Sequence, residues 1–317
     1  MAESILNQPQ FQDADKAREY LEAQVWPHGR VCPHCGAIGE HYVLQGASNR
    51  PGLYKCADCR EPFTVTVGTV FERSKIGLHL WLQAVYLMSA SKKGISAKQL
   101  ERMLGVTYKT AWFMAHRIRE AMKTSPDGLL GSGGGTVEAD ETYWGNTLQS
   151  KVGKLVGSSY VSTYKEKIVS LVQRGSTVRS FHVQTVNAKT LAEIIAKNVA
   201  KDANLMTDES PIYNRLGKDY ASHETVKHKM KEYARGHVTT NTVEGYFSIL
   251  KRGLIGTFHH VGEQHLQRYC NEFDFRYNSR TALGYNDTDR TNLALKGITG
   301  KRLTYRRTDS EVQALKV

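Results

Sequence analysis

The chain has 317 residues, with 43 Lys and Arg against 31 Asp and Glu, so its formal net charge is +12. This length allows a substantial core and more than one domain. The basic excess favours a polyanionic partner, nucleic acid before membrane, because neutralising phosphates releases condensed counterions. The longest apolar stretch, Leu78 to Ala90, is shorter than the roughly 20 residues that span a bilayer, and the N-terminus lacks the pattern of a secretory signal. We therefore expect a cytoplasmic protein with no membrane partner.

Four of the five cysteines form two Cys-x-x-Cys pairs, Cys32 with Cys35 and Cys56 with Cys59, separated by twenty residues. This spacing is typical of two knuckles that offer four thiolates to one tetrahedral zinc. A disulfide framework is the poorer alternative in a cytoplasmic chain. Four protein ligands leave no open position, so the predicted Zn2+ is structural rather than catalytic. Residues 63–67 alternate like a strand, which makes the module a zinc ribbon.

Three helical segments are expected after the ribbon. Leu78 to Met88 is apolar enough for one packed helix, Ser96 is suited to cap a second that ends at Gly105, and Thr107 begins a third. Apolar residues recur at helical spacing in the last two, at Leu100, Met103, Leu104, Ala111, Met114 and Ile118. Helix, glycine-containing turn and helix together predict a helix-turn-helix.

In a helix-turn-helix the last helix enters the major groove of DNA. The side chains predicted to contact DNA from that helix are Tyr108, Lys109, Arg117 and Arg119. The alternative is a three-helix packing unit that makes no DNA contact. The zinc ribbon and the positive charge favour DNA contact. Residues 125–135 then have the composition of a linker.

The third region has the pattern of an α/β domain. We expect strands at 136–143, 168–172, 178–183, 203–208 and 224–227, and after the third strand a helix with Leu191, Ile194, Ile195 and Val199 on one side. The first strand carries Asp140, the fourth ends at Asp208, and a helix with Glu244 follows. The order strand-strand-strand-helix-strand-helix-strand-helix, with acids at these places, predicts an RNase H-like fold of the retroviral-integrase type, a mixed sheet flanked by helices.

The segment 239–252 predicts a helix with two faces. Val243, Phe247, Leu250 and Leu254 recur at the spacing of a buried stripe. Asn241, Glu244, Ser248 and Lys251 form a polar stripe on another side. A carboxylate and an ammonium two turns apart could hold a metal ion and a phosphate together. An isolated pair of this kind is more often a solvated face, so the two further acids on strand ends decide the interpretation.

Several strings along nearly the whole chain are distinctive. Besides the cysteine ribbon they are Gly68-Thr69-Val70-Phe71, Glu138-Ala139-Asp140-Glu141-Thr142, Thr207-Asp208-Glu209, Thr240-Asn241-Thr242-Val243-Glu244-Gly245, Leu250-Lys251-Arg252-Gly253, Gly256-Thr257-Phe258-His259-His260 and Glu272-Phe273-Asp274-Phe275-Arg276-Tyr277-Asn278. In these strings the chain resembles the DDE transposases of bacterial insertion sequences, specifically insertion-sequence family 1595, the ISXO-like group. The resemblance implies a first catalytic acid at Asp140, a second at Asp208, and a third position followed by the helix lysine Lys251.

The third ligand position has two candidates, Asn241 and Glu244, three residues apart on one helical face. Glu244 is favoured because an anionic oxygen holds a hard divalent cation more strongly than a neutral amide does. Its spacing to Lys251 also matches the usual arrangement in such enzymes. Asn241 remains the alternative ligand.

The first strand also offers competitors to Asp140. Strand alternation places Glu141 on the opposite face from Asp140, which makes it the weaker candidate. Glu138 shares the face of Asp140 but lies two residues earlier.

Phosphodiester cleavage explains why three acids are needed. Two Mg2+ (or Mn2+) ions about 3.5–4 Å apart can activate an attacking oxygen and stabilise the leaving 3′-oxygen. Asp140 would bridge both ions, Asp208 and Glu244 would each hold one, and Lys251 with Arg252 would contact DNA. Water would first free a 3′-hydroxyl at the element's end, and that hydroxyl would then attack target DNA. The partners are therefore double-stranded DNA, both element ends and target, and a second copy of the chain in a homo-oligomer.

Two other functions compete with an active transposase. A sequence-specific DNA-binding regulator, derived from an inactive transposase, would need only the ribbon and the helix-turn-helix. A tyrosine-type recombinase would use a Tyr nucleophile without metal, and the three acids argue against it. His259 and His260 have no Cys or His partner at ligand spacing, so a second zinc site is not expected.

The sequence predicts five regions in this order: an N-terminal helix and zinc ribbon at 1–75, a helix-turn-helix region at 76–125, a linker at 126–135, an RNase H-like catalytic domain at 136–290 and a basic C-terminal tail at 291–317.

Overall fold

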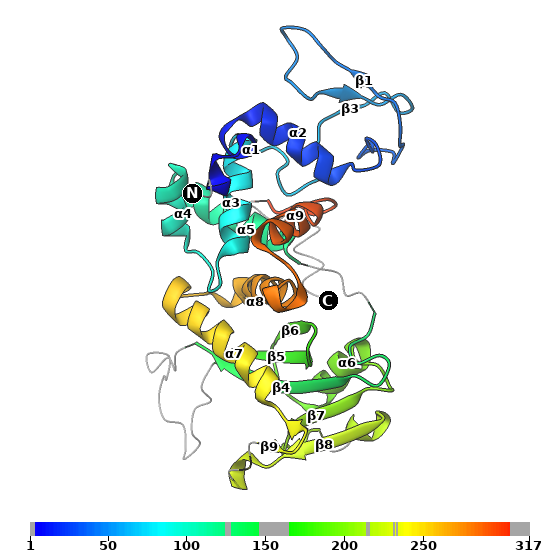
Figure 1. Ribbon diagram of the computed structural model, residues 1–317, viewed down its shortest axis with the longest axis vertical. Coiled ribbons are helices and arrows are strands. Elements are labelled where there is room, and N and C mark those ends of the chain that lie inside the picture. The colour runs from blue at the N-terminus through cyan, green and yellow to red at the C-terminus, as the bar shows by residue number, and fades with distance from the viewer. Residues whose placement is uncertain are drawn as a thin grey trace, which may run out of the picture. The chain divides into compact units, whose positions relative to one another are not determined.

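The computed structural model describes residues 4–123, 128–145, 165–213, 216–230, 232 and 234–304. The chain forms two compact units (Figure 1): Met1–Thr124 with Gly284–Val317, and Ser125–Leu283. The C-terminal segment therefore belongs to the first unit, and part of the predicted basic tail is instead helix α9 (Asp287–Lys296), whose N-terminus has a capping box formed by Asn286 and Asp289. The rest of the predicted tail beyond residue 304 lies outside the described residues.

The first unit is built around α3 (Leu78–Ala90), in which Trp81, Leu82 and Met88 are fully buried. Helix α3 contacts α1 (Pro9–Gln12), α2 (Ala14–Val25), α5 (Tyr108–Ala121) and α9. A short 3-10 helix, η1 (Ile5–Asn7), precedes α1. Asp13 caps α2 by accepting hydrogen bonds from the backbone amides of Asp15 and Lys16. Among the described residues, no helix combines the length and hydropathy needed to cross a membrane.

Helices α4 (Ala97–Leu104) and α5 lie where the sequence predicted the last two helices of its three-helix segment. Ser96 caps α4 and Thr107 caps α5, each accepting a hydrogen bond from the amide three residues on. Gly105 ends α4 with a φ of 65°, a left-handed conformation that costs other residues more than glycine. One detail differs: Met103, expected on the apolar face of α4, is 48% exposed.

The ribbon is a small antiparallel sheet of β1 (Tyr42–Val43), β2 (Tyr54–Lys55) and β3 (Pro62–Phe63), in that order. The strand predicted at 63–67 ends at Phe63, so that part of the prediction is wrong. Thr64 and Val65 are buried together with Phe63, and the backbone amide of Val67 donates to the carbonyl of Thr64 in a turn. Three consecutive buried residues do not follow the alternation of a strand with one buried face.

The second unit contains a five-stranded sheet with the order β6-β5-β4-β7-β8. Antiparallel pairs join β4 to β5 and β5 to β6, and parallel pairs join β4 to β7 and β7 to β8. The strands are β4 (Thr136–Trp144), β5 (Glu166–Gln173), β6 (Val178–Val183), β7 (Asn204–Asp208) and β8 (Ser222–Val226). This mixed α/β topology fits the predicted RNase H-like fold, and every predicted strand of the domain is present.

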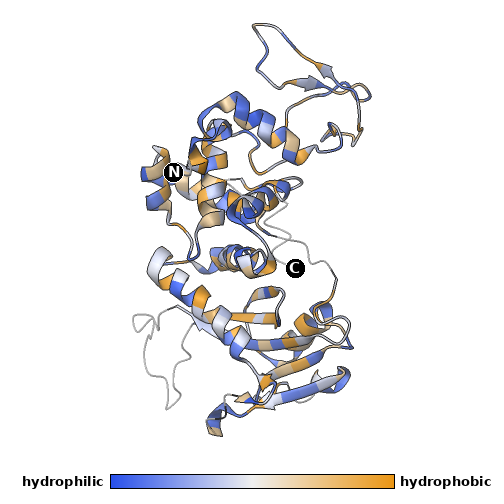
Figure 2. Cartoon of the chain, viewed as in Figure 1, coloured by the Kyte–Doolittle hydropathy of each residue, from blue (hydrophilic) through white to orange (hydrophobic). Residues whose placement is uncertain are grey.

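Each face of this sheet has its own core. On one face Val169 and Leu171 of β5 pack with residues of α6 (Ala188–Asn198). On the other face Ile168 and Val172 pack with residues of α7 (Asn241–Gly253) and α8 (Glu263–Asn278). Figure 2 shows hydrophobic and hydrophilic residues interspersed along these strands and helices, as expected where each element has a buried and a polar side. Cys270 of α8 is fully buried in the second core, as a core residue should be.

Shorter elements connect the sheet to α7. They are the 3-10 helices η3 (Leu216–Asp219) and η4 (His228–Met230), and the hairpin of β9 (Ala234–Arg235) with β10 (Val238–Thr239). The α-helix expected between the fourth and fifth strands is replaced, among the described residues, by the single turn of η3. After α7 the chain continues as a π-helical segment, η5 (Leu254–Phe258), and a last 3-10 turn, η6 (Thr281–Leu283), follows α8.

Part of the predicted linker belongs to the second unit. Leu130 is buried, and it exchanges backbone hydrogen bonds with Asn198 and Ala200 at the end of α6. Gly131 has a φ of 77°, and a Cβ there would lie 2.5 Å from that of Ala203. Glycines in this stretch thus permit close backbone packing rather than free motion. Residues 124–127 of the predicted boundary lie outside the described residues.

Candidate functional site

The first two candidate acids lie on the same face of the sheet. Strands β4 and β7 are parallel neighbours whose register pairs Glu138 with Met206, and Asp140 and Asp208 each lie two residues further along. Because side chains alternate along a strand, residues two apart share a face, and paired residues on neighbouring strands point the same way. Val137 and Ala139 pack on the α6 face, so Asp140 points to the α7 face.

The pKa of Asp140 is raised by its burial and by nearby negative charges. Burial raises the pKa of Asp140 to about 7, and the charges of Glu141, Asp208 and Glu244 contribute in the same direction, against a lowering by the Glu141 backbone amide. That amide donates a 2.8 Å hydrogen bond to Oδ1 of Asp140. Asp140 therefore lies in a concentration of carboxylates, which is the electrostatic setting that favours a bound cation.

Helix α7 has the two faces that its sequence predicts. Val243, Phe247, Leu250 and Leu254 are buried, and the polar stripe of Asn241, Glu244, Ser248 and Lys251 is exposed. Lys251 and Arg252 both lie on the exposed surface of the last turn, where the Nε of Arg252 donates to the carbonyl of Ser248. The exposed position of the stripe leaves Glu244 and Lys251 accessible to a ligand.

Glu244 is held by two neighbours that the sequence did not indicate. The hydroxyl of Thr240 donates to Oε1 of Glu244 over 2.9 Å, and Nε2 of His228 lies 3.4 Å from the same oxygen. His228 also lies 3.2 Å from the Thr240 hydroxyl. The carboxylate of Glu209 accepts hydrogen bonds from the backbone amides of His228 and Lys229, which fixes the turn that carries this histidine. Only the fold brings His228 to α7, so no local pattern could have revealed it.

The carboxylates of the candidate acids lie near one another, but they are not as closely grouped as the ligands of a single metal ion. Among the described residues, the ligand atoms of the four ribbon cysteines all lie within 4.8 Å of one another. No group of three acidic side chains in the described structure is as close together. Three carboxylates repel one another in the absence of a cation. An arrangement around two ions also spaces the ligands more widely than an arrangement around one.

The two other acids on β4 are engaged elsewhere. Glu138 is fully buried, and its carboxylate accepts hydrogen bonds from Arg174 and from the N-terminus of α7. Glu141 points to the α6 face, as alternation predicts, and its Oε2 accepts a 2.8 Å hydrogen bond from the hydroxyl of Tyr213. Burial raises the pKa of Glu141, and the charge of Asp208 adds to this rise. Asp140 is thus the acid of β4 that faces Glu244 without a side-chain partner of its own in the described structure.

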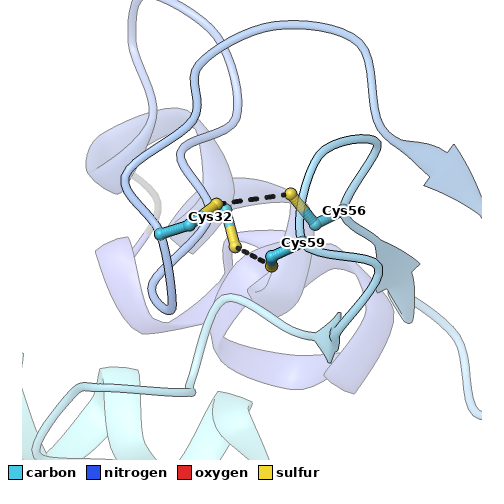
Figure 3. A group of neighbouring side chains, drawn as sticks. Cys32, Cys56 and Cys59 are labelled. Carbon is cyan, nitrogen blue, oxygen red and sulfur yellow. Dashed lines mark hydrogen bonds between the residues drawn. The ribbon is translucent and has the colours of Figure 1, made fainter.

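The ribbon cysteines have the geometry of a tetrahedral zinc site. Their Sγ atoms lie 3.7 Å apart in the pair Cys32 and Cys59, and 3.6 Å apart in the pair Cys35 and Cys56. Zinc–sulfur bonds of about 2.3 Å in a tetrahedron place the sulfurs about 3.8 Å apart. Figure 3 shows the sulfurs of Cys32, Cys56 and Cys59 turned toward a common centre. Burial raises the pKa of Cys56, but the backbone amides of Cys59 and Asp58 outweigh it and bring the pKa to about 6. The donor set therefore fits structural Zn2+.

The predicted DNA-contacting residues of α5 separate into two groups. Tyr108 and Lys109 are exposed in its first turn. Arg117 and Arg119 are 9% and 2% exposed, so neither presents its guanidinium to solvent. Arg117 donates to the backbone carbonyls of Glu72 and Leu303 and lies over the ring of Phe113. The burial of these two guanidinium groups argues against the predicted DNA contact of Arg117 and Arg119, since a buried side chain cannot reach DNA without a rearrangement.

Fold and site together define a two-part protein, with a four-cysteine ribbon in one unit and an acid-bearing mixed sheet in the other. Family models match both parts. Residues 132–278 match the ISXO2-like transposase domain, and residues 12–61 match the transposase zinc-ribbon domain. The chain belongs to this family of insertion-sequence transposases.

A relative supports the family assignment over most of the chain. It is described as an uncharacterized protein in the transposable element ISH50 of Halobacterium salinarum, and it is 30% identical over 270 residues, covering 81% of this chain and 88% of that protein. Two solved structures also align with this chain. The Mos1 strand transfer complex is 14% identical over 62% of this chain and 75% of that chain, with a TM-score of 0.20. A pre-cleavage Mos1 transpososome is 13% identical over 64% and 77%, with a TM-score of 0.21. Similarity at this level does not bear on the assignment.

Proposed function

We propose that this transposase cleaves a phosphodiester bond at the ends of its element and joins the freed 3′-hydroxyls to target DNA. The observation that carries the proposal is the position of Asp140 and Asp208. They lie side by side on one sheet face, and the charge of Glu244 on α7 acts on Asp140. Two-metal hydrolysis of a phosphodiester uses carboxylates gathered in this way on a surface that DNA can reach.

Oxygen ligands of this kind suit Mg2+ or Mn2+. When bound, such ions supply activation of the attacking oxygen and stabilisation of the leaving 3′-oxygen. Asp140 interacts electrostatically with both other acids, so we assign it the shared position, with Asp208 and Glu244 each at one side. Asn241 is exposed at the first turn of α7 and is the alternative to Glu244.

The rest of α7 binds the substrate. Lys251 lies two turns beyond Glu244 on the same exposed stripe, with Arg252 beside it. We propose that these two cations hold the DNA phosphates next to the scissile bond. Their contribution is electrostatic positioning of the strand against the acids, and it does not depend on base sequence.

The first unit supplies DNA recognition in this proposal. Helix α4, Gly105 and α5 form a helix-turn-helix that presents Tyr108 and Lys109 at the N-terminus of its second helix, where such motifs contact base edges. Two element ends must be joined in one event, so a homo-oligomer brings two copies of the chain together on double-stranded DNA.

The test is cleavage of a labelled duplex that carries the element's terminal inverted repeat. We expect cleavage and strand transfer with Mg2+ or Mn2+ and none with a chelator. Asp140→Asn and Asp208→Asn should each lose both steps while binding the duplex like the wild type. Asp219→Asn, at an exposed acid of the same unit, is the matched control and should keep both steps.

Other outcomes separate the competing functions. Strand transfer retained by Asp140→Asn or Asp208→Asn would remove that residue from the site. Tight binding to the repeat without cleavage under any divalent metal would favour a DNA-binding regulator. A covalent protein–DNA adduct that forms in a chelator would favour a tyrosine recombinase.

A further inference from the structure

The N-cap residue of the helix that carries the third acid makes no side-chain cap. Thr240 occupies the N-cap position of α7, and its hydroxyl donates to Glu244. The hydroxyl of the preceding residue, Thr239, accepts a hydrogen bond from the backbone amide of Asn241, over 3.0 Å. The first backbone amides of a helix have no partner within the helix, and leaving them unpaired is unfavourable. The next two backbone amides, those of Thr242 and Val243, therefore need an acceptor from another element.

Glu138 of β4 provides that acceptor. Its Oε2 accepts hydrogen bonds from the backbone amides of Thr242 and Val243, over 2.8 and 2.9 Å. Its Oε1 accepts a third from the Thr242 hydroxyl, over 2.9 Å. Glu138 is 0% exposed, so water does not compete for these bonds. A carboxylate at this end of a helix is also stabilised by the positive end of the helix dipole.

Arg174 completes the arrangement from the end of β5. Its Nε donates to Oε1 of Glu138 over 2.6 Å. Its two terminal nitrogens donate to the backbone carbonyls of His237 and Thr239, over 2.7 and 2.8 Å. The guanidinium thus joins the sheet to the hairpin that leads into α7, and it balances the buried negative charge of Glu138.

These contacts connect the first acid to the third. Glu138 lies two residues before Asp140 on one strand face, and Thr242 lies two residues before Glu244 on α7. A carboxylate has about four acceptor positions, and the four hydrogen bonds to Glu138 occupy them. Glu138 is therefore unsuited to bind a metal ion itself, although it shares the face of Asp140.

We propose that Glu138 and Arg174 form a clamp that fixes α7 against β4 and so positions Glu244 for metal binding opposite Asp140. The role of the clamp in metal binding rests on the proposed function. The hydrogen bonds that form the clamp do not depend on that function. Glu138 is a positioning residue, since it acts through Glu244 and not on the reacting atoms.

The experiment compares Glu138→Gln with the matched control Glu166→Gln. Glu166 also pairs with a side chain on the same sheet, its Oε2 lying 2.7 Å from Nε2 of His182, and none of its hydrogen bonds in the described structure goes to α7. Each variant of the full chain is measured for thermal unfolding, for hydrogen exchange of the amides at 240–246, for Mn2+ affinity by calorimetry, and for cleavage at rising Mn2+ concentration.

We expect Glu138→Gln to stay folded, to bind DNA normally, and to lose protection at the Thr242 and Val243 amides. Its Mn2+ affinity should fall about 10–100-fold, the size of effect seen when a residue that orients a metal ligand is lost. Cleavage should recover toward the wild-type rate at saturating Mn2+. Thr242→Val removes one donor only and should show a smaller fall, and it carries the test if Glu138→Gln fails to fold. Glu166→Gln should match the wild type in exchange at 240–246 and in Mn2+ affinity.

Three results would overturn the clamp. Unchanged Mn2+ affinity together with lost amide protection would make Glu138 a structural cap alone. Abolished Mn2+ binding with protected amides would make Glu138 a direct metal ligand. Unchanged protection and affinity would remove it from both roles. If the wild type itself neither binds Mn2+ nor cleaves DNA, the proposed function fails, and amide exchange still decides whether Glu138 holds the helix.

Discussion

The zinc ribbon and the acidic site of this transposase are assembled in different ways. The ribbon cysteines come from two short turns, and their sulfur atoms lie within 4.8 Å of one another. The acids come from β4, β7 and α7, and burial together with the charges of Glu141, Asp208 and Glu244 raises the pKa of Asp140. Hydrogen-bonded sulfurs can approach closely before a metal binds, as in the pairs Cys32–Cys59 and Cys35–Cys56, whereas ionised carboxylates repel one another. The ribbon is thus organised around its own metal ligands. In the acidic site, the sheet and the proposed clamp hold the carboxylates near one another against their electrostatic repulsion.

The largest effect should come from breaking the ribbon. Cys56→Ser, or removal of zinc by a chelator, should unfold residues 30–65, because zinc binding in such modules contributes on the order of 10 kcal/mol to folding. The second unit should keep its fold, since it has its own core. Hydrogen exchange resolved by segment measures both. Exchange in β4 and β5 that rises as much as exchange in the ribbon would show that the units do not fold independently.

The next effect concerns pH in the acidic site. Burial, with help from neighbouring charges, raises the pKa of Asp140 to about 7 in the folded protein, above its unfolded value near 3.8. The folded state therefore holds the proton more tightly, so the metal-free protein should lose stability as pH rises from about 4 to 7, by at most about 4 kcal/mol. Chemical denaturation of wild type and Asp140→Asn across this range measures the difference. Parallel curves for the two proteins would contradict the assignment.

The same proton should compete with the metal. Mn2+ affinity should rise with pH up to about 7, by up to about tenfold per unit, since binding requires the deprotonated carboxylate. Calorimetry in buffers of different ionisation enthalpy would count the protons released. Zinc in the ribbon should show a related dependence, because protons also compete for its thiolate ligands.

These two regions also show what the sequence could predict. The ribbon cysteines were readable from spacing alone, and the faces of α7 from periodicity, because both signals are local. The shared face of Asp140 and Asp208 depends on the parallel register of β4 and β7, which no local pattern carries. The role of Glu138 was not readable either, since its partners on α7 lie 104 and 105 residues away.

The arginines of α5 show the same limit in the first unit. Arg117 and Arg119 were predicted to contact DNA because they lie on the last helix of a helix-turn-helix. One acceptor of Arg117 is the carbonyl of Leu303, 186 residues further along the chain. The return of segment 284–304 into the first unit therefore contributes to the burial of Arg117, and no helical pattern within α5 carries that information.

A substitution in the core beneath the acidic site should lower the free energy of unfolding less than a substitution in the ribbon does, but more than a substitution on the exposed face of α7 does. Leu250 is fully buried between α7 and the sheet, so Leu250→Ala should destabilise the second unit by about 3 kcal/mol through lost burial and a cavity. Ser248→Ala, on the exposed stripe of the same helix, should change stability by less than about 0.5 kcal/mol. Urea denaturation compares them. Equal losses would mean that α7 is not held by its apolar face.

The smallest effect should come from the exposed surface of α7, which we propose binds DNA. Lys251→Ala removes one exposed cation from the last turn of α7, so the affinity for nonspecific duplex should fall only severalfold, and the slope of log Kd against log salt should decrease by about 1. Lys197→Ala, at an exposed lysine of α6, is the matched control and should leave the slope unchanged, because α6 covers the opposite face of the sheet. Fluorescence anisotropy over a salt series provides both numbers. If the two variants have the same slope, DNA does not run along α7, and the acids of β4 and β7 would then have to meet their substrate from another side.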